Sequence, residues 1–274
     1  MPENNTAPQS ETSQAPPVLV ERDGHVLVLT INRPHVRNAV NQAVGTTIGY
    51  ALEEAANDPQ VRAVVLTGAG DKAFCAGADL AALSRGEDFY VEGHASWGFG
   101  GYVGHFIDKP TIAAVNGLAF GGGAELVLAS DLVVAVESAK IGLPEVTRGL
   151  IAGAGGAFRL PEQIPRRVAM RLLLTGEPIT AAEAQRWGLI NEVVPDGKAL
   201  EAALTLAHTI AANAPLAVWA TKRLAYGVRD GRPENERDQW KHNLDEVAAL
   251  LRTEDAAAGP RAFTEKRAPR WKAR

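Results

Sequence analysis

The pattern of apolar and polar positions divides the chain into two parts. In the first part, short β-branched and apolar runs alternate with segments of helical composition, whereas the last third shows helical periodicity only. Strands are expected at residues 25–32, 61–67, 111–115 and 132–136. Helices are expected at residues 41–57, 121–130, 166–174, 180–187, 200–213, 215–226 and 233–252. Alternation followed by helices alone predicts an α/β core with a helical C-terminal portion.

Two segments lack a readable period. Residues 83–109 combine glycines with aromatic side chains, and a loop of this length inside a compact domain is usually functional or disordered. Residues 1–17 are polar and rich in Pro, Ser, Thr and Asn, which predicts a disordered tail. We therefore divide the chain into this tail (1–17), a core (18–212) and a C-terminal helical region (213–274).

Composition and charge narrow the class of protein. The chain has 274 residues, a formal net charge of −4 and no extended basic stripe, so a nucleic-acid partner is not expected. A single cysteine, Cys75, excludes a disulfide within the chain. The histidines show no metal-ligand spacing, and no apolar run approaches the roughly 18 residues that cross a bilayer. These features predict a cytoplasmic protein with no metal site and no membrane partner.

Three short segments combine glycine with small residues. They are AFCAGADL at 73–80, NGLAFGGGAE at 116–125 and GAGG at 153–156. Glycine lets backbone N–H groups approach a ligand closely, so two such loops could supply two donors to one oxygen, as in an oxyanion hole. The alternative is that each segment is a tight turn or a helix-packing contact. None continues into Gly-Lys-Ser/Thr, which argues against a phosphate-binding loop.

Glu125 and Glu145 stand out because each lies in an apolar neighbourhood. Glu125 occupies AELVLA within the expected helix 121–130, and Glu145 follows Pro144 after KIGL. A buried charge is costly unless it has a function or a partner. If the two carboxylates meet at one end of the sheet, proximity favours a single shared proton, which suits general acid–base catalysis. The alternative at each position is an ordinary surface glutamate.

Taken together, these segments resemble the crotonase, or enoyl-CoA hydratase/isomerase, family from about Val18 to the C-terminus. The matching motifs are, in order, Asn32-Arg33-Pro34 with Asn38-Ala39, residues 73–80, Lys109-Pro110 through Glu125, Pro144-Glu145, GAGG at 153, GLINEVV at 188 and AFTEKRAPRW at 262. The resemblance implies a crotonase-like α/β spiral of ββα units, in which the C-terminal helical region assembles homotrimers or dimers of trimers. It also implies that the substrate is an acyl-CoA thioester; coenzyme A is part of the substrate, and no separate cofactor is expected.

The resemblance further implies roles for individual residues. The backbone N–H groups of Ala78 and Gly122 would form an oxyanion hole around the thioester carbonyl. Glu125 would help take the proton of a water molecule as its oxygen attacks C3, and Glu145 would supply a proton to C2. Coenzyme A would lie along Val36, Arg37, Ala39, Ala76, Asp79 and Leu80. Phe263 and Lys266 would reach the nucleotide of a neighbouring subunit.

The reaction expected from the resemblance is hydration of a 2-enoyl-CoA thioester. Isomerases of the family commonly lack the first glutamate, whereas both are present here. An isomerase, a hydrolase and a carnitinyl-CoA dehydratase-type reaction remain alternatives on the same fold. The AFGGGAE loop and the AFTEKRAPRW ending favour the branch with carnitinyl-CoA dehydratase and mycobacterial-type hydratases of branched or steroid acyl chains. Ala152 stands where many members have proline before GAGG, which is expected to alter the acyl-side wall.

Two further classes of protein compete with this interpretation. The first is a dinucleotide-binding oxidoreductase, because Gly68, Gly70 and Ala73 follow a strand in a G-x-G-x-x-A pattern. However, Cys-Ala-Gly-Ala-Asp follows instead of a long helix, and no second βαβ half is visible. The second is a non-catalytic scaffold that binds a protein or RNA. The acidic balance and the presence of both glutamates argue against that class.

Overall fold

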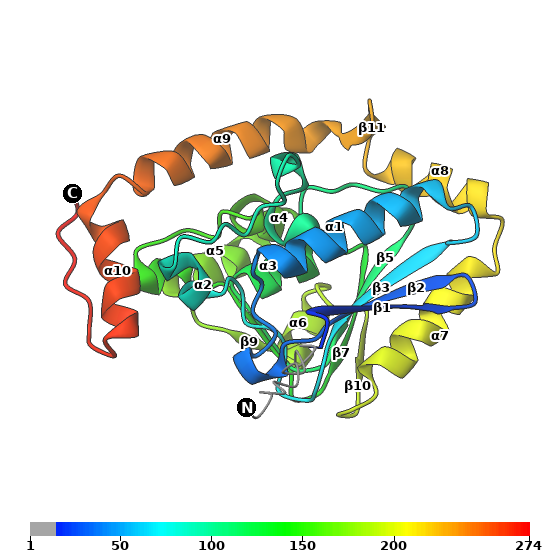
Figure 1. The fold of residues 1–274 in the computed structure, drawn as a ribbon, viewed down its shortest axis with the longest axis horizontal. Helices are drawn as coiled ribbons and strands as arrows, with labels where there is room; N and C mark the ends of the chain where they lie inside the picture. The colour runs from blue at the N-terminus through cyan, green and yellow to red at the C-terminus, as the bar shows by residue number, and fades with distance from the viewer. Residues whose placement is uncertain (1–14) are drawn as a thin grey trace, which may run out of the picture.

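The computed structural model describes residues 15–274, without the side chains of Leu83, Ser84 and Phe263. Most of the tail expected at residues 1–17 therefore lies outside the described residues. The first strand begins at Val18, where the apolar pattern of the sequence begins. The described chain forms two stacked β-sheets with helices around them and an outlying C-terminal helical region (Figure 1).

The larger sheet has six strands in the order β1-β2-β3-β5-β7-β10. These are β1 (Val18–Asp23), β2 (Val26–Ile31), β3 (Ala63–Gly68), β5 (Thr111–Val115), β7 (Leu132–Val136) and β10 (Glu192–Val194). β1 and β2 form an antiparallel hairpin, and all other neighbouring strands are parallel. β3 and β5 are buried along their whole length, which explains their continuous apolar runs.

The smaller sheet has four short strands in the order β4-β6-β8-β9. They are β4 (Ala73–Cys75), β6 (Leu118–Phe120), β8 (Lys140–Gly142) and β9 (Ile179–Thr180). β4, β6 and β8 are parallel, and β9 pairs with β8 antiparallel. Each of β4, β6 and β8 directly follows a strand of the larger sheet, so each repeat of the chain adds one strand to each sheet. This arrangement confirms the expected crotonase-like spiral.

Helices occupy the connections between strands and cover the sheets. They are α1 (Gln42–Asn57), α2 (Leu80–Ser84), α3 (Gly122–Ala129), α4 (Gly156–Gln163), α5 (Arg166–Thr175), α6 (Ala181–Arg186) and α7 (Ala199–Ala211), with the 3-10 turns η1 (Pro34–Val36), η2 (Ala95–Trp97), η3 (Phe99–Gly101) and η4 (Glu145–Arg148). α7 packs on β3, β5 and β7 through buried alanines at every fourth position, because small side chains allow a helix to lie close to a sheet. The Thr180–Glu183 capping box at the start of α6 is also present.

The segment at 83–109, which has no readable period in the sequence, packs against α1. Trp97 of η2 stacks between two imidazole rings, with ring centroids 3.9 Å from His94 and 4.4 Å from His105. On α1, a Cβ at Gly49 would lie 2.5 Å from the indole, so glycine is required for this contact. This packing gives the loop a defined path along one side of the cavity described below.

The C-terminal part of the chain has few buried residues. It consists of α8 (Pro215–Ala225), the hairpin β11 (Val228–Arg229) and β12 (Arg232–Pro233), α9 (Glu234–Leu250) and α10 (Glu254–Thr264). α9 runs along one edge of the molecule, with α8 and α10 at opposite ends (Figure 1). α8 has no buried residue and α9 has one, Asn243. The division of the chain at residue 213 stays a prediction.

Among residues 15–274, no single helix is long and apolar enough to cross a membrane. α7 and α8 together meet that criterion by length and composition, but they are bent by 106° relative to each other.

Candidate active site

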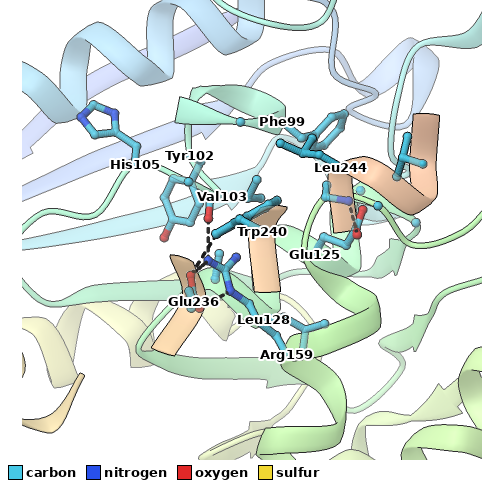
Figure 2. Close-up of a pocket in the computed structure, with 18 of the residues that line it drawn as sticks. Phe99, Tyr102, Val103, His105, Glu125, Leu128, Arg159, Glu236, Trp240 and Leu244 are labelled. Atoms are coloured by element: carbon cyan, nitrogen blue, oxygen red, sulfur yellow. Dashed lines mark hydrogen bonds and ion pairs between the residues drawn. The ribbon is translucent and has the colours of Figure 1, made fainter. Parts of the chain in front are cut away.

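A cavity of about 920 Å³ lies between the core and the C-terminal helices. Four elements contribute carboxyl groups or backbone polar groups to its lining: the turn after β4, the start of α3, η4 and the GAGG loop at 153–156. Aromatic and aliphatic side chains of the 89–107 segment and of α9 form much of the remaining lining (Figure 2). Segments that follow β4, β6 and β8 of the smaller sheet therefore meet at one apolar cavity, as is usual for a small-molecule site.

Glu125 lies in the first turn of α3 and is 3% exposed. Its Oε1 accepts hydrogen bonds from the backbone N–H of Ala154, at 2.7 Å, and of Gly156, at 2.9 Å. A Cβ at Gly156 would lie 3.0 Å from the same oxygen, so the loop needs glycine for this close approach. Burial and the negative charge of Glu145 raise the pKa of Glu125 to about 8.

Glu145 begins η4 and borders the same cavity. Its Oε1 lies close to Gly121, where a Cβ would be 3.3 Å away, and Gly121 directly precedes α3. Its Oε2 is buried and has no hydrogen-bond partner among the described residues. Burial raises the pKa of Glu145 to about 7. The two carboxyl groups therefore border one cavity and act on each other electrostatically, an arrangement that the sequence spacing permits, and near neutral pH they favour a state in which they share one proton.

Two backbone N–H groups lie beside the carboxyl groups. Ala78 follows β4 and Gly122 begins α3, and a Cβ at Gly77 would be 3.2 Å from the nitrogen of Gly122. Within the described residues, neither Ala78 nor Gly122 has an acceptor for its N–H. The first N–H groups of a helix have no partner inside the helix, so the two donors can serve an oxygen bound in the cavity.

Backbone hydrogen bonds join residues 37–40 to residues 76–79, which brings together the two main segments expected to bind coenzyme A. Arg37, in a left-handed conformation with φ 55°, accepts the N–H of Ala76 on its carbonyl at 3.0 Å. Val36 is half-buried, Ala39 is buried, and Ala76 and Leu80 border the cavity. The Asn38 side chain holds this turn through bonds to the carbonyls of Ala69 and Ala73.

Asp79 has structural partners in addition to its expected role. Its Oδ2 pairs with the Arg33 guanidinium at 2.9 Å, and its Oδ1 accepts the N–H groups of Ala81 and Ala82 at the start of α2. The carboxylate therefore caps α2. Lys266 is exposed, two residues beyond the end of α10, and the Phe263 side chain lies outside the described residues. Binding of coenzyme A by these residues stays a prediction.

Ala152 does not border the cavity, contrary to the expectation that it alters the acyl-side wall. It is buried, and a Cβ at Gly156 would lie 2.9 Å from the Ala152 methyl group. The residue instead supports the GAGG loop from behind. Cys75 is fully buried, and burial raises the pKa of its thiol to about 12. It is therefore a packing residue and not a nucleophile.

Several polar residues near the cavity were not singled out from the sequence. Arg159 of α4 is buried, pairs with Glu236 of α9 through two hydrogen bonds of 2.8 and 2.7 Å, and donates to the Val103 carbonyl (Figure 2). Lys222 of α8 pairs with Asp131 at 2.7 Å. These ion pairs join residues far apart in the sequence, and no local motif predicts them. In the part of the chain that the structure describes, no group of three or more His, Cys, Asp or Glu side chains could hold a metal ion.

Comparison with known proteins identifies the class that this fold and site define. Residues 21–274 match the sequence model of the family described as Enoyl-CoA hydratase/isomerase. The chain belongs to this family, the crotonase family, and is a hydro-lyase that acts on acyl-CoA thioesters.

Individual relatives are similar in sequence to this protein over nearly the whole chain. A carnitinyl-CoA dehydratase of Salmonella typhi is 40% identical over 92% of this chain and 97% of its own length. The crystal structure of a carnitinyl-CoA hydratase from Mycobacterium avium is 64% identical, with a TM-score of 0.94, and covers 95% of this chain and 100% of that one. An enoyl-CoA hydratase from Mycobacterium tuberculosis H37Rv is 42% identical, with a TM-score of 0.74 and the same shares of each chain.

Proposed function

We propose that this protein adds water across the 2,3 double bond of a 2-enoyl-CoA thioester. The observation that carries the proposal is the pair of carboxyl groups on one apolar cavity, buried Glu125 and partly buried Glu145, both with raised pKa values. Their environment keeps one proton available near neutral pH. An acid and a base are then present together, as addition of water requires.

The proposed reaction balances with groups of this chain alone. The two carboxyl groups share one proton, and the arrangement that reacts has this proton on Glu145 and leaves Glu125 ionised. The oxygen of a water molecule bonds to C3 while Glu125 takes one of its protons. The π electrons move onto C2 and the thioester oxygen, where the N–H groups of Ala78 and Gly122 stabilise the developing negative charge more than they stabilise the substrate. Protonated Glu145 then gives its proton to C2. Proton exchange between the two carboxyl groups restores the starting state.

The test is hydration of crotonyl-CoA, followed by the loss of the conjugated thioester absorbance. Glu125→Gln and Glu145→Gln should each lower kcat by about 10²- to 10⁴-fold, the usual contribution of general acid–base catalysis. Glu137→Gln, at an exposed glutamate outside the cavity, is the matched control and should leave kcat unchanged. Full activity in either cavity variant would contradict the proposal.

A second candidate is the dehydration of a carnitinyl-CoA-type substrate, whose acyl group ends in a quaternary ammonium. The observation that favours it is an aromatic cluster, Phe89, Tyr90 and Phe99, on the same cavity. Phe89 lies 4.7 Å from Tyr90 and 5.7 Å from Phe99 between ring centroids, and Phe99 packs directly against Gly122. Aromatic faces attract quaternary ammonium groups, and the shared negative charge of the glutamate pair adds to this attraction.

A matched pair of substrates separates the two candidates. The first, 4-trimethylammonio-2-butenoyl-CoA, carries the cation, and the second, 5,5-dimethyl-2-hexenoyl-CoA, replaces nitrogen by carbon in the same shape. A carnitinyl-type enzyme should favour the cation in kcat/KM by about 5- to 30-fold, the range of a cation–π contact. Phe99→Leu should remove that preference. Equal rates, or faster turnover of the neutral substrate, would leave the enoyl-CoA hydratase as the better assignment.

We further propose that the enzyme is cytoplasmic and that copies of this chain associate as a trimer or dimer of trimers through the C-terminal helices. Large apolar side chains of α8, of α9 and of the residue directly after α9 are exposed: Leu216 by 74%, Leu224 by 83%, Leu244 by 52% and Leu251 by 60%. An exposed apolar surface of this kind is typical of a protein–protein contact. The proposal agrees with the assembly that the family resemblance implies.

A further inference from the structure

Asn243 is the single buried residue of α9 and lies against the loop that holds Glu125. It is 7% exposed, and its side-chain amide donates a 2.7 Å hydrogen bond to the carbonyl oxygen of Gly153. One turn further along α9, Val247 touches the same residue, because a Cβ at Gly153 would be 2.6 Å from its Cγ2 atom. α9 therefore contacts the GAGG loop at Gly153, the first residue of that loop.

The Gly153 carbonyl and the Ala154 N–H belong to one peptide group. That group is planar, and in its trans form the C=O and N–H bonds point in opposite directions. Asn243 holds the oxygen end at 2.7 Å, and Glu125 Oε1 accepts the N–H end, also at 2.7 Å. The orientation of one peptide plane thus connects the amide of Asn243 with the carboxyl group of Glu125. Hydrogen bonds in such a chain also polarise one another.

We propose that Asn243 is a positioning residue for catalysis: by fixing the peptide plane between Gly153 and Ala154, it orients and stabilises the Glu125 carboxylate. The inference rests on the proposed function, in which Glu125 exchanges a proton with water. It assigns to the C-terminal helical region a role in the chemistry of its own chain, in addition to any role in assembly.

Other contacts keep α9 in place when Asn243 is changed. Glu236 lies two turns earlier on the same helix and pairs with Arg159 through two hydrogen bonds. Gln239 of α9 donates to Glu162 of α4 at 2.6 Å. A substitution at Asn243 therefore releases the peptide plane without removing the contacts that dock the helix.

The charged and titratable groups that face Glu125 remain the same in an Asn243 variant. They are Glu145 on η4, Arg159 on α4 and Tyr90 in the 83–109 segment. Asn243 itself is neutral at every pH. A shift in the pH profile after its substitution therefore reports a change in the hydrogen bonding of Glu125.

The experiment compares Asn243→Leu, which removes the donor at similar volume, with Gln239→Leu, which removes an amide contact of the same helix away from the loop. Asn243→Leu should lower kcat for crotonyl-CoA hydration by about tenfold, the effect of weakening one charge-assisted hydrogen bond, with KM within about twofold. Its acidic pH limb should move to higher pH, because an N–H donor favours the ionised carboxylate. Gln239→Leu should change neither kcat nor the pH profile.

A double-mutant cycle with Glu125→Gln separates positioning from a merely structural effect. If Asn243 acts through Glu125, Asn243→Leu should cost little further activity in the Glu125→Gln background. Additive losses, or a lower Tm with kcat and pH profile unchanged, would overturn the inference. Asn243→Ala removes the donor without adding bulk or charge, and it replaces the leucine variant if that protein does not fold. If Glu125→Gln itself keeps full activity, the proposed function fails instead, whatever Asn243 does.

Discussion

Two opposing influences act on the pKa of the Glu125 carboxyl group. Two backbone N–H groups at 2.7 and 2.9 Å favour the ionised form, while burial and the charge of Glu145 favour the neutral form and prevail, with a pKa of about 8. Since a carboxyl group usually titrates near pH 4, folding raises its affinity for protons. Binding of the proton that catalysis needs therefore also increases the free energy of unfolding.

We predict that this linkage makes the enzyme less stable at alkaline pH. Both folded pKa values, about 8 and about 7, lie above the unfolded value. The stabilisation that proton binding gives is therefore complete below about pH 4 and is lost as the pH rises through the folded values. Glu125→Gln carries no charge to desolvate and can still accept both N–H groups.

Thermal unfolding between pH 5 and pH 9 measures this effect. The Tm of Glu125→Gln should rise relative to wild type as the pH increases, by about 2–4 °C for each kcal/mol of linkage in a chain of this size. Glu137→Gln, at an exposed site, should show a constant difference from wild type. A constant difference for Glu125→Gln as well would mean that Glu125 is not protonated in the folded enzyme near neutral pH.

At the scale of elements, η4 is held between two helices. On one side, a Cβ at Gly176, the residue after α5, would lie 2.8 Å from the Thr147 methyl group. On the other side α10 packs so closely that a Cβ at Gly259 would overlap the carbonyl oxygen of Arg148. The C-terminal segment adds to this contact, because a Cβ at Gly149, directly after η4, would lie 3.1 Å from the Trp271 ring. The Asp255 carboxylate of α10 holds that segment by accepting the N–H groups of Lys272 and Ala273. The turn that carries Glu145 thus depends on α10.

We predict that Gly259→Ala separates α10 from η4. The added methyl group overlaps backbone, which cannot move as a flexible side chain can, so the cost should be about 1–3 kcal/mol of overpacking. Activity should fall together with stability, because η4 carries Glu145. Chemical denaturation and kcat measure the two effects. Ala257→Ser, at an exposed position of the same helix, should change neither, and an unaffected Gly259→Ala enzyme would show that α10 is not docked on η4 in solution.

The sequence predicts the long elements well because their patterns are local. β5 and β7 have the expected bounds, and α1, α3 and α5–α9 lie within one or two residues of theirs. The smaller sheet is not predicted, since strands of two or three residues are too short to show a period. α4 is hidden by Gly156 at its start and Pro161 within it. α10 likewise contains Gly259 and Pro260, and its position depends on packing against η4.

The residues of the site divide in the same way, into those with a local sequence signal and those defined only by long-range contacts. A glutamate in an apolar helix is unusual in itself, so Glu125 is found without a structure. Asn243 and Arg159 lie in ordinary polar helical sequence, and their importance comes from contacts with Gly153 and Glu236, 90 and 77 positions away. Only the fold reveals such pairs, because side-chain hydrogen bonds between distant elements leave no periodic signal in either segment.

For the whole molecule, the C-terminal helices are the least buried part of the described chain. α8 contains no buried residue and exposes Leu216 and Leu224, whereas the core helices bury a clear apolar face. A helix with an uncovered apolar side is stable when another surface packs on it. The proposed assembly of identical chains would supply that surface.

We predict that Leu224→Glu weakens the assembly, because it places a charge on the most exposed apolar residue of α8. Light scattering coupled to size-exclusion chromatography should show a smaller particle than wild type, with the circular dichroism spectrum unchanged. Thr205→Glu adds the same charge to an exposed position of α7 and should leave the particle size unaltered. A wild-type protein that is already monomeric at micromolar concentration would refute the assembly itself.

Cys75 gives the molecule a practical property. It is the one cysteine of the sequence, it ends β4 with a fully buried side chain, and this burial raises the pKa of its thiol to about 12. For chemical labelling the natural protein therefore behaves as if it had no cysteine. A thiol introduced at an exposed site such as Glu137 would be the single position to take up a maleimide dye or spin label. Distances between subunits could then be measured without altering the core.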